Sequence, residues 1–383
     1  MRSKPKLYVM KKIVIASDSF KGSLSSKQVA QTVSESLQRI YKNCEIIALP
    51  IADGGEGLTE ALIDASKGSW TACRALDPLG REIVASYGIS QDGLTAIVEM
   101  AAASGLPLVE KEKRNPLLTT SYGTGQVIAD ALSRGCKHFL IGIGGSATND
   151  AGVGMLQALC FEFYSKGRLL PMAGGASLAL IDRISSENIN PLIKQSRFTV
   201  ACDVNNPLYG ASGAARVYAP QKGASPADVE RLDEGLRNFG SLINTMGVEV
   251  QEIAGAGAAG GMGAGLAVFL NAELKRGIDL VLDYLRFDEL IADADLIITG
   301  EGRMDEQTLM GKAPSGVLTR ALNQGIPCIA LAGRIDDEKI LKGAGFEALL
   351  EVSPRSMPLD EAMKPETTQE NISKVVANYF SNK

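Results

Sequence analysis

The sequence is poor in the residues on which several common chemistries depend. Its 383 residues include one histidine and one tryptophan, and its six cysteines form no Cys-x-x-Cys pair. The single His138 excludes a histidine-rich metal cage and a pair of histidines that share acid and base roles. Proton transfer would therefore fall to aspartate, glutamate or lysine.

The cysteines and the N-terminal residues predict a cytoplasmic protein. Widely spaced cysteines are typical of free thiols in a reducing compartment. The apolar stretch 7–10 after the basic N-terminus is shorter than the ~7–15 residues of a signal-peptide core, so export is not expected.

Long apolar runs and clustered positive charge are also missing. No run approaches the ~20 apolar residues that a bilayer span requires, so no membrane partner is expected. The 39 lysines and arginines are scattered and are outnumbered by 44 aspartates and glutamates, for a net charge of −5. Because nucleic-acid surfaces need clustered positive charge, no nucleic-acid partner is expected. Small molecules remain as partners, and no pattern in the sequence bears on oligomeric state.

Both ends of the chain show buried strands alternating with amphipathic helices, which predicts an α/β fold with one doubly wound parallel sheet. The middle of the chain has shorter extended pieces between turn signals and looks like an inserted domain. We expect an N-terminal extension over 1–11, one domain made of 12–70 and 290–383, and an inserted α/β domain over 71–289. The strands expected in the first domain cover 12–16, 45–51, 296–299, 327–332 and 348–352.

Glycine is abundant, with 41 residues, or about 11% against a usual ~7%. Polar, glycine-bearing segments follow several predicted strands, where open α/β sheets bind ligands. In the first, Ser19 and Lys21 can hold an anion, or the loop only caps a helix. In the second, Asp53 and Glu56 can bind Mg²⁺ beside phosphate, or form a solvated turn.

The segment 142–150 follows a predicted strand and precedes a helix, so its backbone N–H groups can form an anion site. It also fits the dinucleotide pattern G-x-G-x-x-A, with Glu162 twenty residues after Gly142 near the position of a ribose-binding acid. A nucleotide-linked oxidoreductase is therefore an alternative.

Two later segments carry further charged candidates. Asp203 ends an apolar strand and can accept a proton or hold a metal, or it caps a turn. Arg303, two residues before Asp305, suits bidentate capture of a carboxylate or phosphate. Lys222 adds a cation, or ordinary surface charge. Many backbone N–H groups with isolated cations and carboxylates suit phosphoryl transfer, which needs charge neutralisation and alignment.

These segments together resemble the bacterial type I glycerate kinase family over essentially the whole chain from Lys12 onward. The resemblance depends on ordered motifs at residues 18–21, 52–57, 77–80, 99–106, 120–125, 142–150, 201–204, 220–224, 255–263 and 299–303. Three features depart from the family pattern: Ser17 where proline is frequent, Ala151 where glycine is frequent, and the extra N-terminal residues.

The resemblance implies phosphorylation of D-glycerate that depends on ATP and Mg²⁺, with the 2-position favoured. It also implies a flavodoxin-like domain interrupted by a restriction-endonuclease-like α/β domain. The alternatives are 3-phosphoglycerate as product, another short hydroxy acid as substrate, the oxidoreductase, and a non-catalytic regulator that binds a phosphorylated metabolite.

Residue chemistry and position together suggest how the substrate is bound in a cleft between the domains. Arg303 and Lys21 would hold the carboxylate, with Ser19 beside them. Asp203 or Asp305 would take the proton from the attacking hydroxyl.

The same reasoning assigns the ATP and metal sites. The loop from Gly144 through Gly145 and Ser146 to Thr148 would cradle the ATP phosphates together with Lys222. Asp53 and Glu56 would lie near Mg²⁺.

Overall fold

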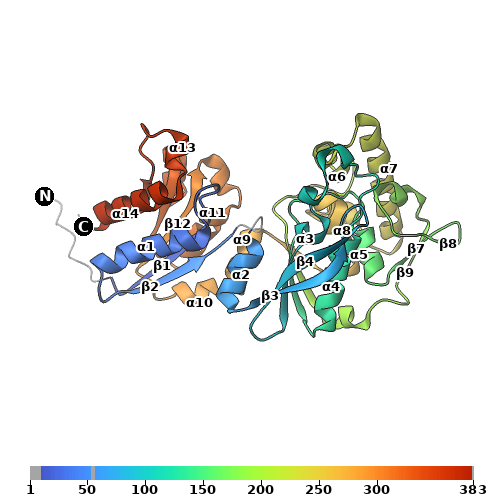
Figure 1. Cartoon of the computed structure of the whole chain (residues 1–383), viewed down its shortest axis with the longest axis horizontal. Helices are drawn as coiled ribbons and strands as arrows, with labels where there is room; N and C mark the ends of the chain where they lie inside the picture. Colours follow the sequence, from blue (N-terminus) through green and yellow to red (C-terminus); the bar gives the residue numbers. More distant parts are fainter. Residues whose placement is uncertain (1–9, 53–56, 382–383) are drawn as a thin grey trace. The chain divides into compact units, whose positions relative to one another are not determined.

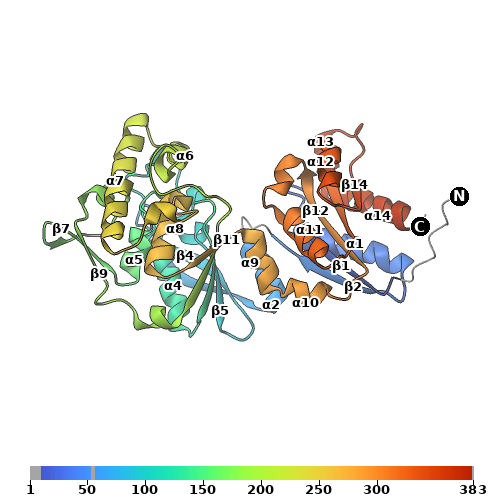
Figure 2. The same ribbon diagram turned by 180° about the vertical axis from the view of Figure 1, so that it is seen from behind.

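The computed structural model describes residues 10–52 and 57–381, which form two units (Figures 1 and 2). Described residues up to 52 and from 281 onward form one unit, called here the split unit. Residues 57–280 belong to the other, the inserted unit. No helix among the described residues combines the length and apolar character of a membrane span.

The split unit is built on a five-stranded sheet in which every pairing is parallel. The spatial order is β14-β13-β12-β1-β2. Counted along this unit, that is the 2-1-3-4-5 order of flavodoxin-like folds. The predicted doubly wound sheet assembled from both ends of the chain is confirmed. Its strands are β1 (Lys12–Ser17), β2 (Glu45–Pro50), β12 (Leu296–Met304), β13 (Cys328–Ile335) and β14 (Ala348–Glu351).

Helices cover both faces of this sheet. Ser25 and Gln28 form a capping box at the start of α1. Apolar residues on one face of α1 pack with α14 and with one side of the central strands. Figures 1 and 2 show α11 on the opposite face. The helices of this unit are α1 (Ser26–Ile40), α10 (Phe287–Ile291), α11 (Ala313–Asn323), α12 (Glu338–Gly343), α13 (Leu359–Ala362) and α14 (Pro365–Ser381).

The inserted unit contains a mixed six-stranded sheet in the order β11-β10-β6-β5-β4-β3. The first four strands are parallel, and β4 is antiparallel to both β5 and β3. Phe139 and Phe198 stack on neighbouring strands with ring centroids 4.8 Å apart. The strands are β3 (Ser69–Leu76), β4 (Glu82–Ile89), β5 (Thr95–Glu99), β6 (His138–Gly142), β10 (Arg197–Ala201) and β11 (Glu273–Lys275), with a separate small sheet of β7 (Glu162–Ser165), β8 (Arg168–Leu169) and β9 (Arg183–Ser185).

The helices of the inserted unit surround these strands (Figure 2). Helix α7 begins at Pro226 after the N-cap residue Ser225, which forms a capping box with Asp228. The main helices are α2 (Leu58–Ser66), α3 (Ala101–Ser104), α4 (Tyr122–Ser133), α5 (Val153–Ala158), α6 (Ala214–Tyr218), α7 (Pro226–Thr245) and α8 (Ala258–Phe269), and α9 (Gly277–Tyr284) runs across the division after residue 280.

The structure divides the chain after residues 53 and 280, earlier than the domain boundaries expected near residues 70 and 290. Packing explains the first difference, since α2 lies against β4 and β5. The backbone N–H of Thr59 also donates to Glu99 Oε1 at 2.9 Å. Helix α2 therefore belongs with the inserted unit although it precedes β3 in the sequence.

Gly300 in β12 offers a test of how tightly the split unit's sheet is packed. A Cβ added there would lie 2.1 Å from the backbone oxygen of Leu331 in β13. We expect Gly300→Ala to lower the free energy of unfolding by about 1–3 kcal/mol through overpacking, as measured by urea denaturation. The matched Gly343→Ala at the end of α12, where an added Cβ meets nothing within 4 Å, should stay within about 0.5 kcal/mol of the wild type. Equal losses in both variants would contradict this account.

Candidate active site

The predicted site residues within the described ranges fall into two groups, one in each unit. In the split unit, β1 and β12 are neighbours at the point where the strand order reverses direction. Open α/β sheets bind ligands beyond the carboxyl ends of strands at such a point. The loop after β1 and the end of β12 are therefore where a ligand is expected in this unit.

The loop after β1 carries Ser19 and Lys21. Ser19 is partly buried and Lys21 is exposed. Asp18 Oδ1 accepts a hydrogen bond from the backbone N–H of Ser19 at 2.6 Å. A Cβ added at Gly302 would lie 3.3 Å from the backbone nitrogen of Lys21. The loop therefore lies directly beside the residue that precedes Arg303.

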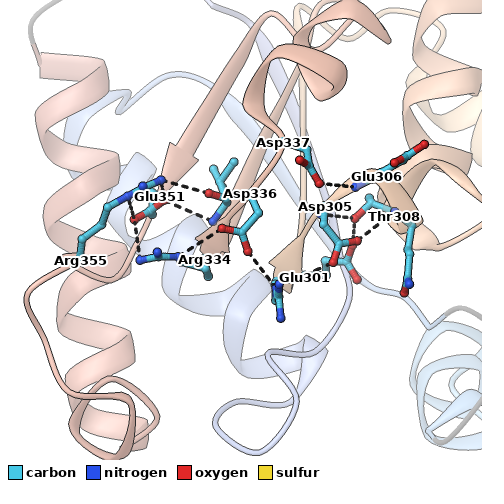
Figure 3. A network of polar contacts seen from close by, with 12 residues as sticks. Glu301, Asp305, Glu306, Thr308, Arg334, Asp336, Asp337, Glu351 and Arg355 are labelled. Carbon is cyan, nitrogen blue, oxygen red and sulfur yellow. Dashed lines mark hydrogen bonds and ion pairs between the residues drawn. The ribbon is translucent and has the colours of Figure 1, made fainter.

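Arg303 and Asp305 lie close together, as the sequence spacing suggested. Arg303 Nε lies 3.8 Å from Asp305 Oδ2 and donates to Asp336 Oδ2 at 3.0 Å. The Arg303 side chain is 67% exposed, so a ligand anion can reach it. Arg334 pairs with Arg303 in the register of β12 and β13, and its Nε lies 3.6 Å from the other oxygen of Asp336. Figure 3 shows Asp336 beside Arg334 in this network.

Three residues behind this group were not among the predicted site residues: Glu301, Thr308 and Lys312. Glu301 is 8% exposed and Thr308 is fully buried. Thr308 Oγ1 donates to Glu301 Oε1 at 2.6 Å, and Lys312 Nζ lies 3.5 Å from Glu301 Oε2. Burial raises the pKa of Glu301 above its usual value, against the opposing effects of Thr308 and Lys312. The available signal was the position of Glu301, two residues before Arg303 and so on the same face of a strand.

In the inserted unit, the structure brings Ser146, Thr148 and Lys222 together. Lys222 is 2% exposed, and its Nζ donates to Ser146 Oγ and to the carbonyl oxygen of Thr148, both at 2.7 Å. Gly144 and Gly145 of the same loop are exposed. Gly145 has φ +68°, in the left-handed region that favours glycine. The loop thus presents its glycines to solvent while Lys222 holds it from beneath.

Two buried charges lie behind this loop. Burial lowers the pKa of Lys222 to about 7, although Asp150 acts in the opposite direction. Asp150 Oδ2 accepts from the backbone N–H and hydroxyl of Ser121 at 2.8 and 2.7 Å, and burial raises the pKa of Asp150. Within the described part of the chain, Thr148 Oγ1 and both polar side-chain atoms of Asn149 are buried without a hydrogen-bond partner.

Asp203 lies at the same sheet edge as this loop, because Ala201 at the end of β10 pairs with Gly142 at the end of β6. The Asp203 side chain is exposed. Its Oδ1 accepts from the backbone N–H of Gly277 at the start of α9, at 2.8 Å. The two candidate bases, Asp203 and Asp305, therefore belong to different units.

The candidate metal ligands Asp53 and Glu56 lie outside the described residues. Among residues 10–52 and 57–381, no three histidine, cysteine, aspartate or glutamate side chains are grouped so as to hold a metal ion.

Glu162, the candidate ribose-binding acid, begins β7 in the small separate sheet. Its carboxylate accepts from the Tyr164 hydroxyl at 2.8 Å and from the Asn188 amide at 3.0 Å. The helix after the Gly142 loop begins only at Val153. The loop therefore lacks the direct strand-to-helix turn of a dinucleotide-binding fingerprint.

Comparison with known proteins gives matches across almost the whole chain. The model of the glycerate kinase family matches residues 13–382. A glycerate kinase from Halalkalibacterium halodurans is 47% identical over 364 residues, covering 93% of this chain and 94% of that protein. A glycerate 2-kinase from Escherichia coli K12 is 46% identical over 355 residues, covering 92% and 93%.

A solved structure agrees with these sequence matches. A crystal structure from Salmonella typhimurium LT2, assigned provisionally to glycerate kinase 2, superposes with a TM-score of 0.88 at 42% identity. The superposition covers 97% of this chain and 98% of that one. The similarity thus includes both units.

The low pKa of Lys222 makes stability depend on pH. Between about pH 7 and its ordinary value of 10.5, the unfolded chain binds a proton that the folded chain does not, so the free energy of unfolding rises with pH. We expect the free energy of unfolding of the wild type, minus that of Lys222→Met, to rise by up to about 1.4 kcal/mol per pH unit above pH 7. Urea denaturation between pH 6 and 9 measures this. The control is Lys137→Met, at an exposed lysine, whose difference from the wild type in free energy of unfolding should not change with pH. A difference between wild type and Lys222→Met that also does not change with pH would refute the proposed effect of Lys222.

Proposed function

The chain belongs to the glycerate kinase family and is a kinase, and we propose that it transfers the γ-phosphoryl group of ATP to D-glycerate, forming 2-phosphoglycerate. The observation that carries this proposal is the family match across residues 13–382, which includes the charged group at the ends of β1 and β12. The name of the Escherichia coli relative, a glycerate 2-kinase, supports the choice of the 2-hydroxyl.

We assign the glycerate carboxylate to Arg303 and Lys21, with Ser19 beside them. Lys21 and Ser19 come from the loop after β1, and Arg303 comes from the adjacent end of β12 at the switch point, where its side chain is exposed. A planar guanidinium can bind both oxygens of a carboxylate at once, which fixes the orientation of a small substrate. That orientation decides which hydroxyl faces the phosphoryl donor.

We assign the ATP phosphates to the loop formed by Gly144, Gly145, Ser146 and Thr148. The ammonium of Lys222 bonds to two atoms of this loop from the buried side. Lys222 would therefore hold the loop in place and contribute positive charge beneath it. Mg²⁺ held near Asp53 and Glu56 would neutralise charge on the phosphate oxygens.

Of the two candidate bases, the arrangement favours Asp305. A general base must reach the proton of the hydroxyl that attacks, and Asp305 lies in the unit that holds the proposed carboxylate site, 3.8 Å from Arg303. As its carboxylate takes the proton, the hydroxyl oxygen bonds to the γ-phosphorus and ADP leaves. Direct transfer requires the substrates bound at the two sites to meet, and we propose that they do so in a cleft between the units that excludes water.

Replacement of the base tests this assignment. Asp305→Asn should reduce turnover by roughly 10²-fold or more, measured as ADP release with ATP, Mg²⁺ and D-glycerate. Asp203→Asn should have the smaller effect. The control is Asp337→Asn, a neighbouring carboxylate that accepts from the backbone N–H of Glu306 at 3.4 Å, and it should leave turnover unchanged. Near-normal turnover of Asp305→Asn together with a large loss in Asp203→Asn would move the role to Asp203.

Phosphorus NMR of the product tests the position of transfer. We expect a 2-phosphoglycerate signal, because the family resemblance and the name of the Escherichia coli relative favour the 2-hydroxyl. A 3-phosphoglycerate signal would keep the kinase but reverse the substrate in the site. If ADP release does not exceed the substrate-free control, D-glycerate is not the substrate, and a panel of short hydroxy acids follows.

A further inference from the structure

A buried chain of hydrogen bonds connects the end of β12 to Asp305 (Figure 3). Thr308 lies in the 3₁₀ turn η7 (Glu306–Leu309) and is fully buried. Its hydroxyl donates to Glu301 Oε1 at 2.6 Å and accepts from the backbone N–H of Asp305 at 3.1 Å. One hydroxyl group therefore connects Glu301 to the backbone of Asp305.

A charged group is a costly choice for this buried position. The start of η7 is already capped without Glu301. The Asp305 side chain accepts a backbone hydrogen bond of η7, and the Thr308 side chain accepts from the backbone N–H of Asp305. Burying a carboxylate costs several kcal/mol unless it is well paired, and Lys312 lies 3.5 Å from Glu301 with a side chain that is 35% exposed. Stability alone thus gives little reason for a glutamate here.

The charge does have a directional effect on the hydrogen bonds. An ionised carboxylate only accepts, so the single hydrogen of the Thr308 hydroxyl must point to Glu301. The oxygen lone pairs of Thr308 are then left for the N–H of Asp305. Burial raises the pKa of Glu301, whereas the Thr308 hydroxyl and Lys312 oppose this effect and favour the ionised form that fixes this direction. A neutral acid at 301 could donate instead, and the orientation would no longer be unique.

The two carboxylate oxygens of Asp305 lie in different surroundings. Its Oδ1 accepts from the backbone N–H of Gln307 at 2.9 Å, while Oδ2 lies on the side of Arg303 at 3.8 Å. With the backbone N–H held by Thr308 and Oδ1 held by Gln307, Oδ2 is the oxygen left to face a ligand bound at Arg303.

We propose that Glu301, acting through the hydroxyl of Thr308, is a positioning residue that orients the carboxylate of Asp305 for proton abstraction. This inference rests on the proposed function, in which Asp305 is the base and Arg303 holds the substrate carboxylate. Neither Glu301 nor Thr308 touches the substrate in this proposal.

The test removes the hydroxyl while preserving the shape of the side chain. Thr308→Val should lower kcat for D-glycerate phosphorylation by about ten-fold or more while KM for D-glycerate changes by less than about three-fold, because only the transition-state geometry is lost. Thr308→Ser keeps the hydroxyl and should restore most of the turnover. Thr319→Val, at an exposed threonine whose hydroxyl donates to the Ser315 carbonyl in α11, is the control for a Thr-to-Val change and should match the wild type.

A double-mutant cycle separates positioning from general loss of structure. If Thr308 acts through Asp305, then adding Thr308→Val to Asp305→Asn should cause no further loss of kcat. Losses that multiply would overturn the inference. If Thr308→Val does not fold, Glu301→Met, which removes the acceptor at similar size, takes its place in the same cycle.

The same experiments distinguish this inference from the proposed function. Wild-type protein that does not phosphorylate D-glycerate would refute the proposed function. Asp305→Asn with normal turnover would refute the assignment of Asp305 as the base, and this inference with it. A large loss in Asp305→Asn with normal turnover in both Thr308→Val and Glu301→Met would refute only the positioning role.

Discussion

The parallel pairing of β1 with β12 is the constraint on which the rest of the structure depends. It joins Ile13 to Leu296 and continues to Ser17 and Gly300, so that the first and last parts of the chain share one sheet. The loop that carries Lys21 and the end of β12 that carries Arg303 become neighbours only through this pairing. The whole inserted unit is then a segment that leaves the sheet after β2 and returns before β12.

Each unit has a buried titratable side chain behind its candidate site, a lysine in one and a glutamate in the other. Lys222 lies beneath the proposed phosphate loop, and Glu301 lies behind the proposed base. In both places the charged group bonds to residues of the site through hydroxyl or backbone atoms. Burial of such groups opposes folding, whereas their hydrogen bonds hold the polar loop above them in one arrangement without solvent reorganisation.

The sequence predicted the features that local pattern encodes. Apolar runs located the five strands of the split unit, and glycine-rich motifs located the loops at the strand ends. The grouping of Ser146 with Lys222 was predicted only as a shared phosphate role, because their contact spans 76 positions and no local pattern reports burial of a lysine. Thr308 was missed because its role depends on a side chain seven positions away across a turn whose path the sequence does not specify.

The β1–β12 pairing also determines the order in which the chain can fold during synthesis. The hydrogen bond from Ser17 Oγ to the Gly300 carbonyl spans 283 positions, so the split unit cannot complete its central strand pair until the ribosome has released β12. The inserted unit is continuous in the chain and can bury its own core before that point. Its folding brings the two distant segments closer and reduces the loop-closure entropy that their pairing must overcome. Until then, β1 and β2 present an unpaired, apolar strand edge, which is a surface that chaperones bind and that aggregates when left uncovered.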